Sequence, residues 1–106
     1  MARVYSQLLG HVNRSGTTDV VLYEASPELV TIIRDMTWIV TDEALAVIII
    51  YYVSGSNTYT IVRDEMNAFD IGHWVGRQVL PPDAVLHAYG MGNDWTVLVS
   101  GYELLP

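Results

Sequence analysis

Turn-forming and polar residues recur along this chain of 106 residues at intervals of roughly ten positions. They gather in short clusters at Asn13–Gly16, Ser26–Glu28, Thr41–Glu43, Ser54–Asn57, Asp64–Asn67, Pro81–Asp83 and Gly90–Asp94. The stretches between these clusters are long enough for strands, but they leave no room for the crossover helices that join parallel strands. The spacing therefore predicts short antiparallel strands in a sandwich or a barrel.

The segments between the turns are rich in valine, isoleucine, threonine, tyrosine and tryptophan, which fit a pleated surface better than a helix. We expect strands at Val4–Leu9, Asp19–Glu24, Leu29–Val40, Leu45–Ser54, Thr58–Val62, Ala68–Val75, Val85–Ala88 and Trp95–Leu104. A helix over Asp42–Tyr52 is the competing interpretation, but three consecutive isoleucines and two tyrosines oppose it. The predicted fold class is all-β, a single antiparallel β-sandwich of jelly-roll-like form that spans residues 1–106.

Two of the predicted strands have informative apolar patterns. In the third, alternation places Val30, Ile32, Met36, Trp38 and Val40 on one face, which Arg34 interrupts. The fourth is apolar on both faces, because Ala44–Val53 contains no charged residue and ends in two tyrosines and a valine. Such a strand lies either deep between two layers or under another chain. Since a body of this size hides few strands completely, the pattern favours a partner or an oligomer.

Composition narrows the class of partner and the location. The net charge is −7 and the only basic side chains besides histidine are five arginines, so a field that attracts nucleic acid is absent. The longest apolar run has ten residues, whereas a membrane-spanning helix needs about 20. Met1–Gly10 lacks the pattern of a secretory signal peptide. We therefore expect neither nucleic acid nor membrane as a partner.

No constellation of residues predicts catalysis or metal binding. The chain contains no cysteine, which excludes a disulfide, a thiolate metal site and a cysteine nucleophile. His11, His73 and His87 fall in separate segments without the spacing of zinc ligands, and the pairs Asp42-Glu43 and Asp64-Glu65 fit solvated turns. We expect no catalytic residue, no cofactor and no bound metal, and the chain is predicted not to be an enzyme.

Aromatic side chains supply the candidate interface. Tryptophan and tyrosine are enriched at protein interfaces and at sugar-binding surfaces, and they also fill sandwich cores. Gly76 is expected to bend the segment His73–Arg77 and to expose Trp74 beside Arg77, which could stack on an aromatic ring or pair with a carboxylate. The predicted interface residues are Trp74, Arg77, Trp38, Tyr51 and Tyr52.

Several short stretches resemble one group of viral proteins. The start Ala2–Gly10, the segment His73–Leu80 and the ending Val97–Leu104 resemble small structural proteins encoded among the minor tail genes of actinobacterial tailed bacteriophages. A tyrosine-bearing strand at Val21–Tyr23 and a strand at Ile32–Asp35 match the same group. The chain departs from the group at the turn after Tyr23, where Ser26-Pro27-Glu28 replaces the proline-alanine-glycine of the group.

The resemblance implies a β-sandwich virion protein without catalysis or cofactor. Its partners would be copies of itself and other virion proteins, and it would be assembled into the virion in the host cytoplasm. Two alternatives stay open. Similar sandwiches decorate phage heads, so the chain could be a capsid decoration protein, and its tryptophans also suit a module that binds a carbohydrate of the host envelope.

Overall fold

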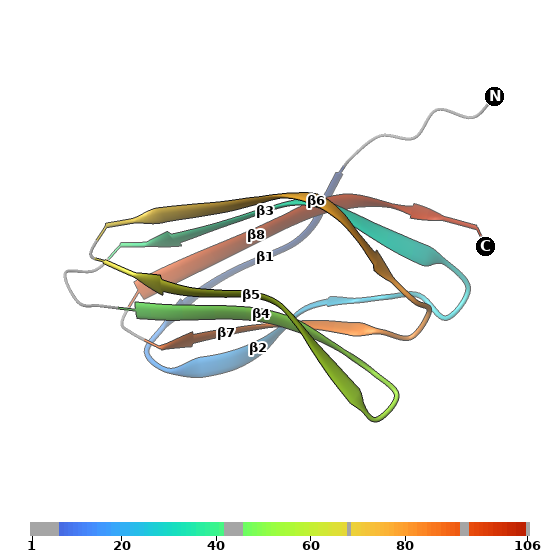
Figure 1. The fold of residues 1–106 in the computed structure, drawn as a ribbon, viewed down its shortest axis with the longest axis horizontal. Helices are drawn as coiled ribbons and strands as arrows, with labels where there is room; N and C mark the ends of the chain where they lie inside the picture. The colour runs from blue at the N-terminus through green and yellow to red at the C-terminus, as the bar shows by residue number, and fades with distance from the viewer. Residues whose placement is uncertain (1–6, 42–45, 68, 92–93, 106) are drawn as a thin grey trace.

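The computed structural model describes residues 7–41, 46–67, 69–91 and 94–105, and within these ranges the chain folds into eight strands without a helix (Figure 1). The strands are β1 Gln7–Ser15, β2 Thr18–Glu24, β3 Val30–Val40, β4 Ala46–Ser54, β5 Asn57–Met66, β6 Ile71–Leu80, β7 Val85–Met91 and β8 Asp94–Leu104. The described residues therefore include no helix that could cross a membrane. The all-β prediction is confirmed.

The strands form two four-stranded antiparallel sheets that pack face to face. Sheet A has the order β1-β8-β3-β6, and sheet B has the order β2-β7-β4-β5. β1 pairs with β8, β2 with β7, β3 with β6 and β4 with β5, so the chain is one long hairpin folded about the β4–β5 turn. Winding of this hairpin adds the pairs β3–β8 and β4–β7. Except at β4–β5, every connection passes from one sheet to the other, and this order is that of a jelly roll.

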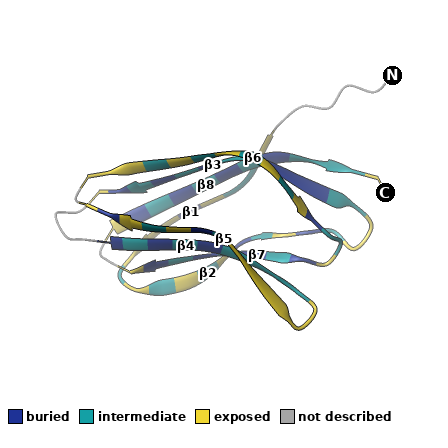
Figure 2. Ribbon diagram, viewed as in Figure 1, coloured by how far each residue is buried: buried dark blue, intermediate teal, exposed yellow. Residues whose placement is uncertain are grey.

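The core lies between the sheets and follows the two-residue period of the strands. In β8, Trp95, Val97 and Val99 are fully buried, as the alternation of that segment predicts. From the other sheet, β4 contributes Ile48 and Ile50, which are also fully buried. Because side chains on the opposite faces of both sheets are more exposed, one apolar layer between two sheets holds the fold together (Figure 2).

β4 is a central strand of sheet B with only one face in the core. Its even-numbered residues from Ala46 to Ile50 are buried, whereas Val47, Ile49, Tyr51 and Val53 are half-buried on the outer face. The interpretation of a strand deep between two layers is therefore wrong, and so is a helix over residues 46–52. Residues 42–45, where this strand and that helix were predicted to begin, lie outside the described residues.

A β-bulge at Arg34 changes the face that β3 presents. Ile33 pairs with Gly101 and Asp35 with Ser100, so Arg34 is an extra residue relative to β8. Because of this insertion, Ile33 joins Met36 in the core cluster, and Ile32 is buried outside that cluster. The prediction that Ile32 and Met36 share a face is wrong for this reason.

Four strands extend further than the turn signals predict, and one of them is β7, which was expected to end at Ala88 and continues through Gly90 to Met91. β1 continues to Ser15 and turns at Gly16, whose φ of 84° suits glycine, while residues 4–6 of the predicted strand lie outside the described residues. β5 continues through Asp64 to Met66, and β6 continues through Gly76 to Leu80. Asparagine, serine and aspartate at these places sit in strands, because their neighbours in the sheets complete the ladders. Gly76 lies where the register between β3 and β6 is irregular.

Candidate interaction surfaces

Trp38, a predicted interface residue, belongs to the core. It is 4% exposed, and its indole Nε1 donates a 2.8 Å hydrogen bond to Oδ2 of Asp64 in β5. Gly72 is the cross-strand partner of Trp38, and a Cβ atom there would overlap the indole ring. Trp38 therefore links sheet A to sheet B, and the assignment of Asp64 to a solvated turn is wrong.

Trp74 and Tyr52 also point inward. Both are half-buried and pack against the core cluster, and Tyr52 stacks on Tyr59 with ring centroids 4.9 Å apart. Trp74 lies beside Gly76, where an added Cβ would come within 2.9 Å of the indole Cζ2 atom. Arg77 is exposed on the strand, but Trp74 is not exposed next to it. The predicted exposed pair of Trp74 and Arg77 is therefore not formed.

β6 exposes apolar residues that lie near the predicted interface residues Trp74 and Arg77 in the sequence. Ile71, Val75 and Val79 are 67%, 67% and 44% exposed, and they alternate with exposed His73 and Arg77 on one face of the strand. Within the part of the chain that the structure describes, β6 pairs only with β3 and forms an edge of sheet A (Figures 1 and 2). We call these five residues the β6 edge. An exposed apolar edge strand is a surface on which another strand can pair.

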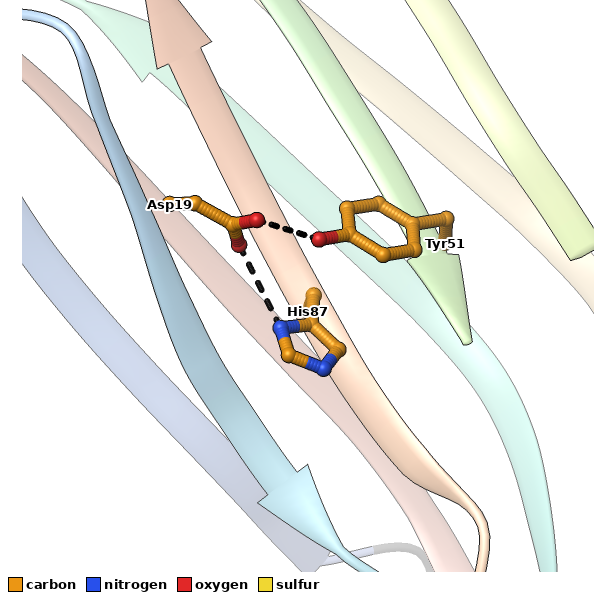
Figure 3. A network of polar contacts seen from close by, with 3 residues as sticks. All are labelled: Asp19, Tyr51 and His87. Carbon is orange, nitrogen blue, oxygen red and sulfur yellow. Dashed lines mark hydrogen bonds and ion pairs between the residues drawn. The ribbon is translucent and has the colours of Figure 1, made fainter. Parts of the chain in front are cut away.

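A second surface is the outer face of sheet B, where Asp19, Tyr51 and His87 form a polar network (Figure 3). They come from the adjacent strands β2, β4 and β7, and Tyr51 and His87 are cross-strand partners. The Tyr51 hydroxyl donates to Oδ2 of Asp19, and the other carboxylate oxygen lies 3.3 Å from His87 Nδ1. The Tyr51 and His87 rings stack with centroids 4.8 Å apart and planes 4° apart.

The electrostatics of this network favour a neutral tyrosine. Partial burial, followed by the hydrogen bond to Asp19 and its negative charge, raises the pKa of Tyr51 to about 12. The carboxylate of Asp19 has two partners from its own chain, the Tyr51 hydroxyl and the His87 imidazole. The network stabilises the outer face of three strands. Of its members, only Tyr51 was a predicted interface residue, and it lies half-buried on this outer face.

Apolar residues surround the polar network. On β2, Val21 is 50% exposed, and on β7, Met91 is 44% exposed. The outward residues of β4 add half-buried valine and isoleucine to the same face. Sheet B therefore offers a broad surface of mixed character, and the described residues contain no pocket.

The three histidines lie on different strands and do not form a cluster. His73 lies 3.1 Å from Asp35 on the outer face of sheet A, His87 belongs to the network on sheet B, and His11 is exposed on β1. Among the residues in the four described ranges, no group of three or more histidine and carboxylate side chains is arranged to hold a metal ion.

Comparison with known proteins gives a likeness of fold to a solved structure. No protein-family model and no curated protein sequence matches the chain. Among solved structures, it is similar to a chain in the structure of infectious bursal disease virus, Gx strain, with a TM-score of 0.54 and 12% sequence identity. The match covers 97% of this chain and 32% of that chain. At this identity the likeness concerns the fold, and it shows that nearly the whole chain has an arrangement found within a longer chain of a virus structure.

Proposed function

We propose that this protein is a structural subunit of a virion, specifically a minor tail protein of a tailed bacteriophage that assembles with copies of itself or with other virion proteins. The observation that carries the proposal is the exposure of Ile71, Val75 and Val79 along one edge strand. Surface of this kind, arranged along a regular strand instead of around a pocket, suits a protein partner. Nucleic acid and membranes are not among the partners we propose.

The fold and the short sequence motifs support this function. Jelly rolls recur in viral capsid proteins, although they also occur in lectins and in cupins. The similar chain belongs to a virus structure, and the short sequence motifs at His73–Leu80 and Val97–Leu104 resemble phage tail proteins. Fold alone does not fix function, so the assignment to the tail rests on the motifs.

The polar network on sheet B favours a role without catalysis. The Asp19–Tyr51–His87 network satisfies its own hydrogen-bonding groups on a flat sheet face, and a reaction would need a concave site that excludes water. We therefore propose that the protein is not an enzyme and uses no cofactor.

Mass spectrometry of purified particles and gold labelling with an antibody test the proposal. The particles come from a phage that carries the gene, and the expected result is a label on the tail. A label on the head would replace the tail assignment by capsid decoration. Absence from the particles, together with binding of the pure protein to host envelope carbohydrate, would replace it by the carbohydrate-binding alternative. Absence from the particles alone overturns the virion role.

A further inference from the structure

We infer that two copies of this chain pair antiparallel through the β6 edge, with Val75 on the two-fold axis. The pairing joins two A sheets into one sheet with four strands from each copy. The inference deepens the proposed function, because it names a second copy of the chain as the partner and β6 as the contact.

The sequence of the β6 edge reads the same in both directions. Its outward residues are apolar, polar, apolar, polar and apolar: Ile71, His73, Val75, Arg77 and Val79. With Val75 opposite Val75 of the second copy, Ile71 meets Val79 and His73 meets Arg77. Every apolar side chain then has an apolar cross-strand neighbour, which is the arrangement that stabilises antiparallel pairs. An interface of this kind is self-complementary, as a two-fold dimer requires.

Neighbouring registers place less compatible side chains opposite each other. A shift of the axis to His73 places two histidines opposite each other and leaves Val79 without a partner strand. A shift to Arg77 places two arginines opposite each other, which is unfavourable. An axis at Trp74 or Gly76 sets apolar residues against His73 and Arg77. The pattern therefore selects Val75.

Charge also favours this register. Asp35 is the cross-strand partner of Val75 within one copy, and its Oδ1 lies 3.1 Å from Nε2 of His73. In the dimer, Arg77 of the second copy lies opposite His73 and approaches the same carboxylate. Each half of the interface then contains one negative and one positive side chain, flanked by the apolar pairs.

On the inner face, the same pairing sets a large residue against a small one. Trp74 of each copy lies opposite Gly76 of the other, and Gly72 lies opposite Gln78. Trp74 already lies against Gly76 of its own strand and is half-buried there. A glycine opposite this indole leaves room for its exposed part, so the predicted role of Trp74 in assembly is to pack beneath the strand pair.

Cysteine cross-linking tests the register, because the natural chain contains no cysteine. In the inferred dimer, Val75→Cys places two thiols in directly opposed positions, and oxidation is expected to link them. Ile71→Cys alone places its thiols about 26 Å apart and is expected to stay unlinked. A mixture of Ile71→Cys and Val79→Cys is expected to give the mixed dimer. Val21→Cys, which is similarly exposed on β2, is the control for random collisions.

Sedimentation of the cysteine-free protein tests the pairing itself. Val75→Lys brings two ammonium groups together on the axis, and we expect the dimer to weaken by about tenfold or more. Val21→Lys, the matched control, is expected to leave it unchanged. A protein that is monomeric at high concentration, or a dimer that Val75→Lys does not weaken, overturns the inference.

The outcomes separate this inference from the proposed function. A dimer with the expected cross-links that is absent from particles supports the β6 pairing and contradicts the virion role. Protein that enters particles but shows none of the cross-links contradicts the β6 pairing and leaves the virion role intact.

Discussion

The indole of Trp38 covers Gly72, its cross-strand partner in β6, and occupies the space that any other side chain at position 72 would need. From there the indole nitrogen reaches Asp64 of the opposite sheet. Trp95 covers Gly90 of β7, which lies in the opposite sheet, and its Nε1 donates a 3.0 Å hydrogen bond to the Gly16 carbonyl. In both places a glycine within a strand lets a tryptophan lie flat and connect distant parts of the chain.

Gly72→Ala is expected to destabilise the fold by about 1–3 kcal/mol, because the added methyl group overlaps the Trp38 ring and forces it to move. Urea unfolding followed by tryptophan fluorescence measures the loss. Introduced into a Trp38→Leu background, the same substitution is expected to cost less, since the ring is gone. Equal costs in the two backgrounds would show that the indole is not the source of the strain.

Asp64→Ala is expected to lower the free energy of unfolding by about 1–3 kcal/mol, because the buried indole N–H of Trp38 loses its acceptor. Glu65→Ala is the matched control. A carboxylate oxygen of Glu65 lies 3.5 Å from Arg63, with both side chains mostly exposed, so its loss is expected to cost less than about 0.5 kcal/mol. Denaturant midpoints of the two variants decide the matter, and equal midpoints would contradict a structural role for Asp64.

The fold class followed from the sequence because turn spacing and β-branched residues are local signals. β8 shows this: Trp95, Val97 and Val99 recur at every second position, and the structure buries all three. The ends of strands were less predictable. Asp64 looks like a turn residue in isolation, and only the fold brings it its strand partner Ile48 and the indole of Trp38, 26 positions away.

The bulge at Arg34 could not be predicted from β3 alone. An inserted residue is defined by the strands next to it, and the strands beside Arg34 are β6 and β8, far along the chain. Trp74 was predicted to be exposed, but it packs against the core cluster. A signal was present, since Gly72, Trp74 and Gly76 share one face on which glycines leave room for indoles.

The surface network was beyond sequence reasoning except for Tyr51. Asp19 and His87 are 68 positions apart, and nothing in their local sequence indicates that β2 and β7 are neighbours. Once the jelly-roll order is known, pairing of strands from the two ends of the hairpin brings them together. Topology therefore supplies the information that single segments lack.

Tyr23→Phe is expected to destabilise the protein by about 1–3 kcal/mol, because the fully buried Thr31 hydroxyl loses a partner. The Tyr23 hydroxyl lies 3.1 Å from Thr31 Oγ1 and donates a 2.8 Å hydrogen bond to Glu103, which ties β2 to β3 and β8. Adding Thr31→Val removes the orphaned hydroxyl and is expected to recover part of the loss. A double-mutant cycle measures this recovery, and strictly additive costs would rule out the coupling.

The raised pKa of Tyr51 predicts that the protein loses stability at alkaline pH. Its pKa rises from 10.0 to about 12 in the folded chain, so the folded state holds the phenol proton more tightly than the unfolded state does. The resulting stabilisation is complete below pH 10 and is lost as the pH rises through about 12. Tyr51→Phe is expected to flatten this part of the stability profile, measured by urea unfolding at a series of alkaline pH values. A profile that Tyr51→Phe leaves unchanged would contradict the assignment.

Asp19→Asn separates the causes of the Tyr51 shift. Burial contributes most to the raised pKa, and the hydrogen bond to Asp19 and its charge contribute less. The asparagine keeps an oxygen that can accept from the Tyr51 hydroxyl but removes the charge, so the pKa is expected to fall only part of the way toward 10.0. Absorbance titration of tyrosinate, with Tyr51→Phe as the reference that lacks this group, measures the change. A complete return to 10.0 would mean that the carboxylate, and not burial on the outer face of sheet B, keeps Tyr51 protonated.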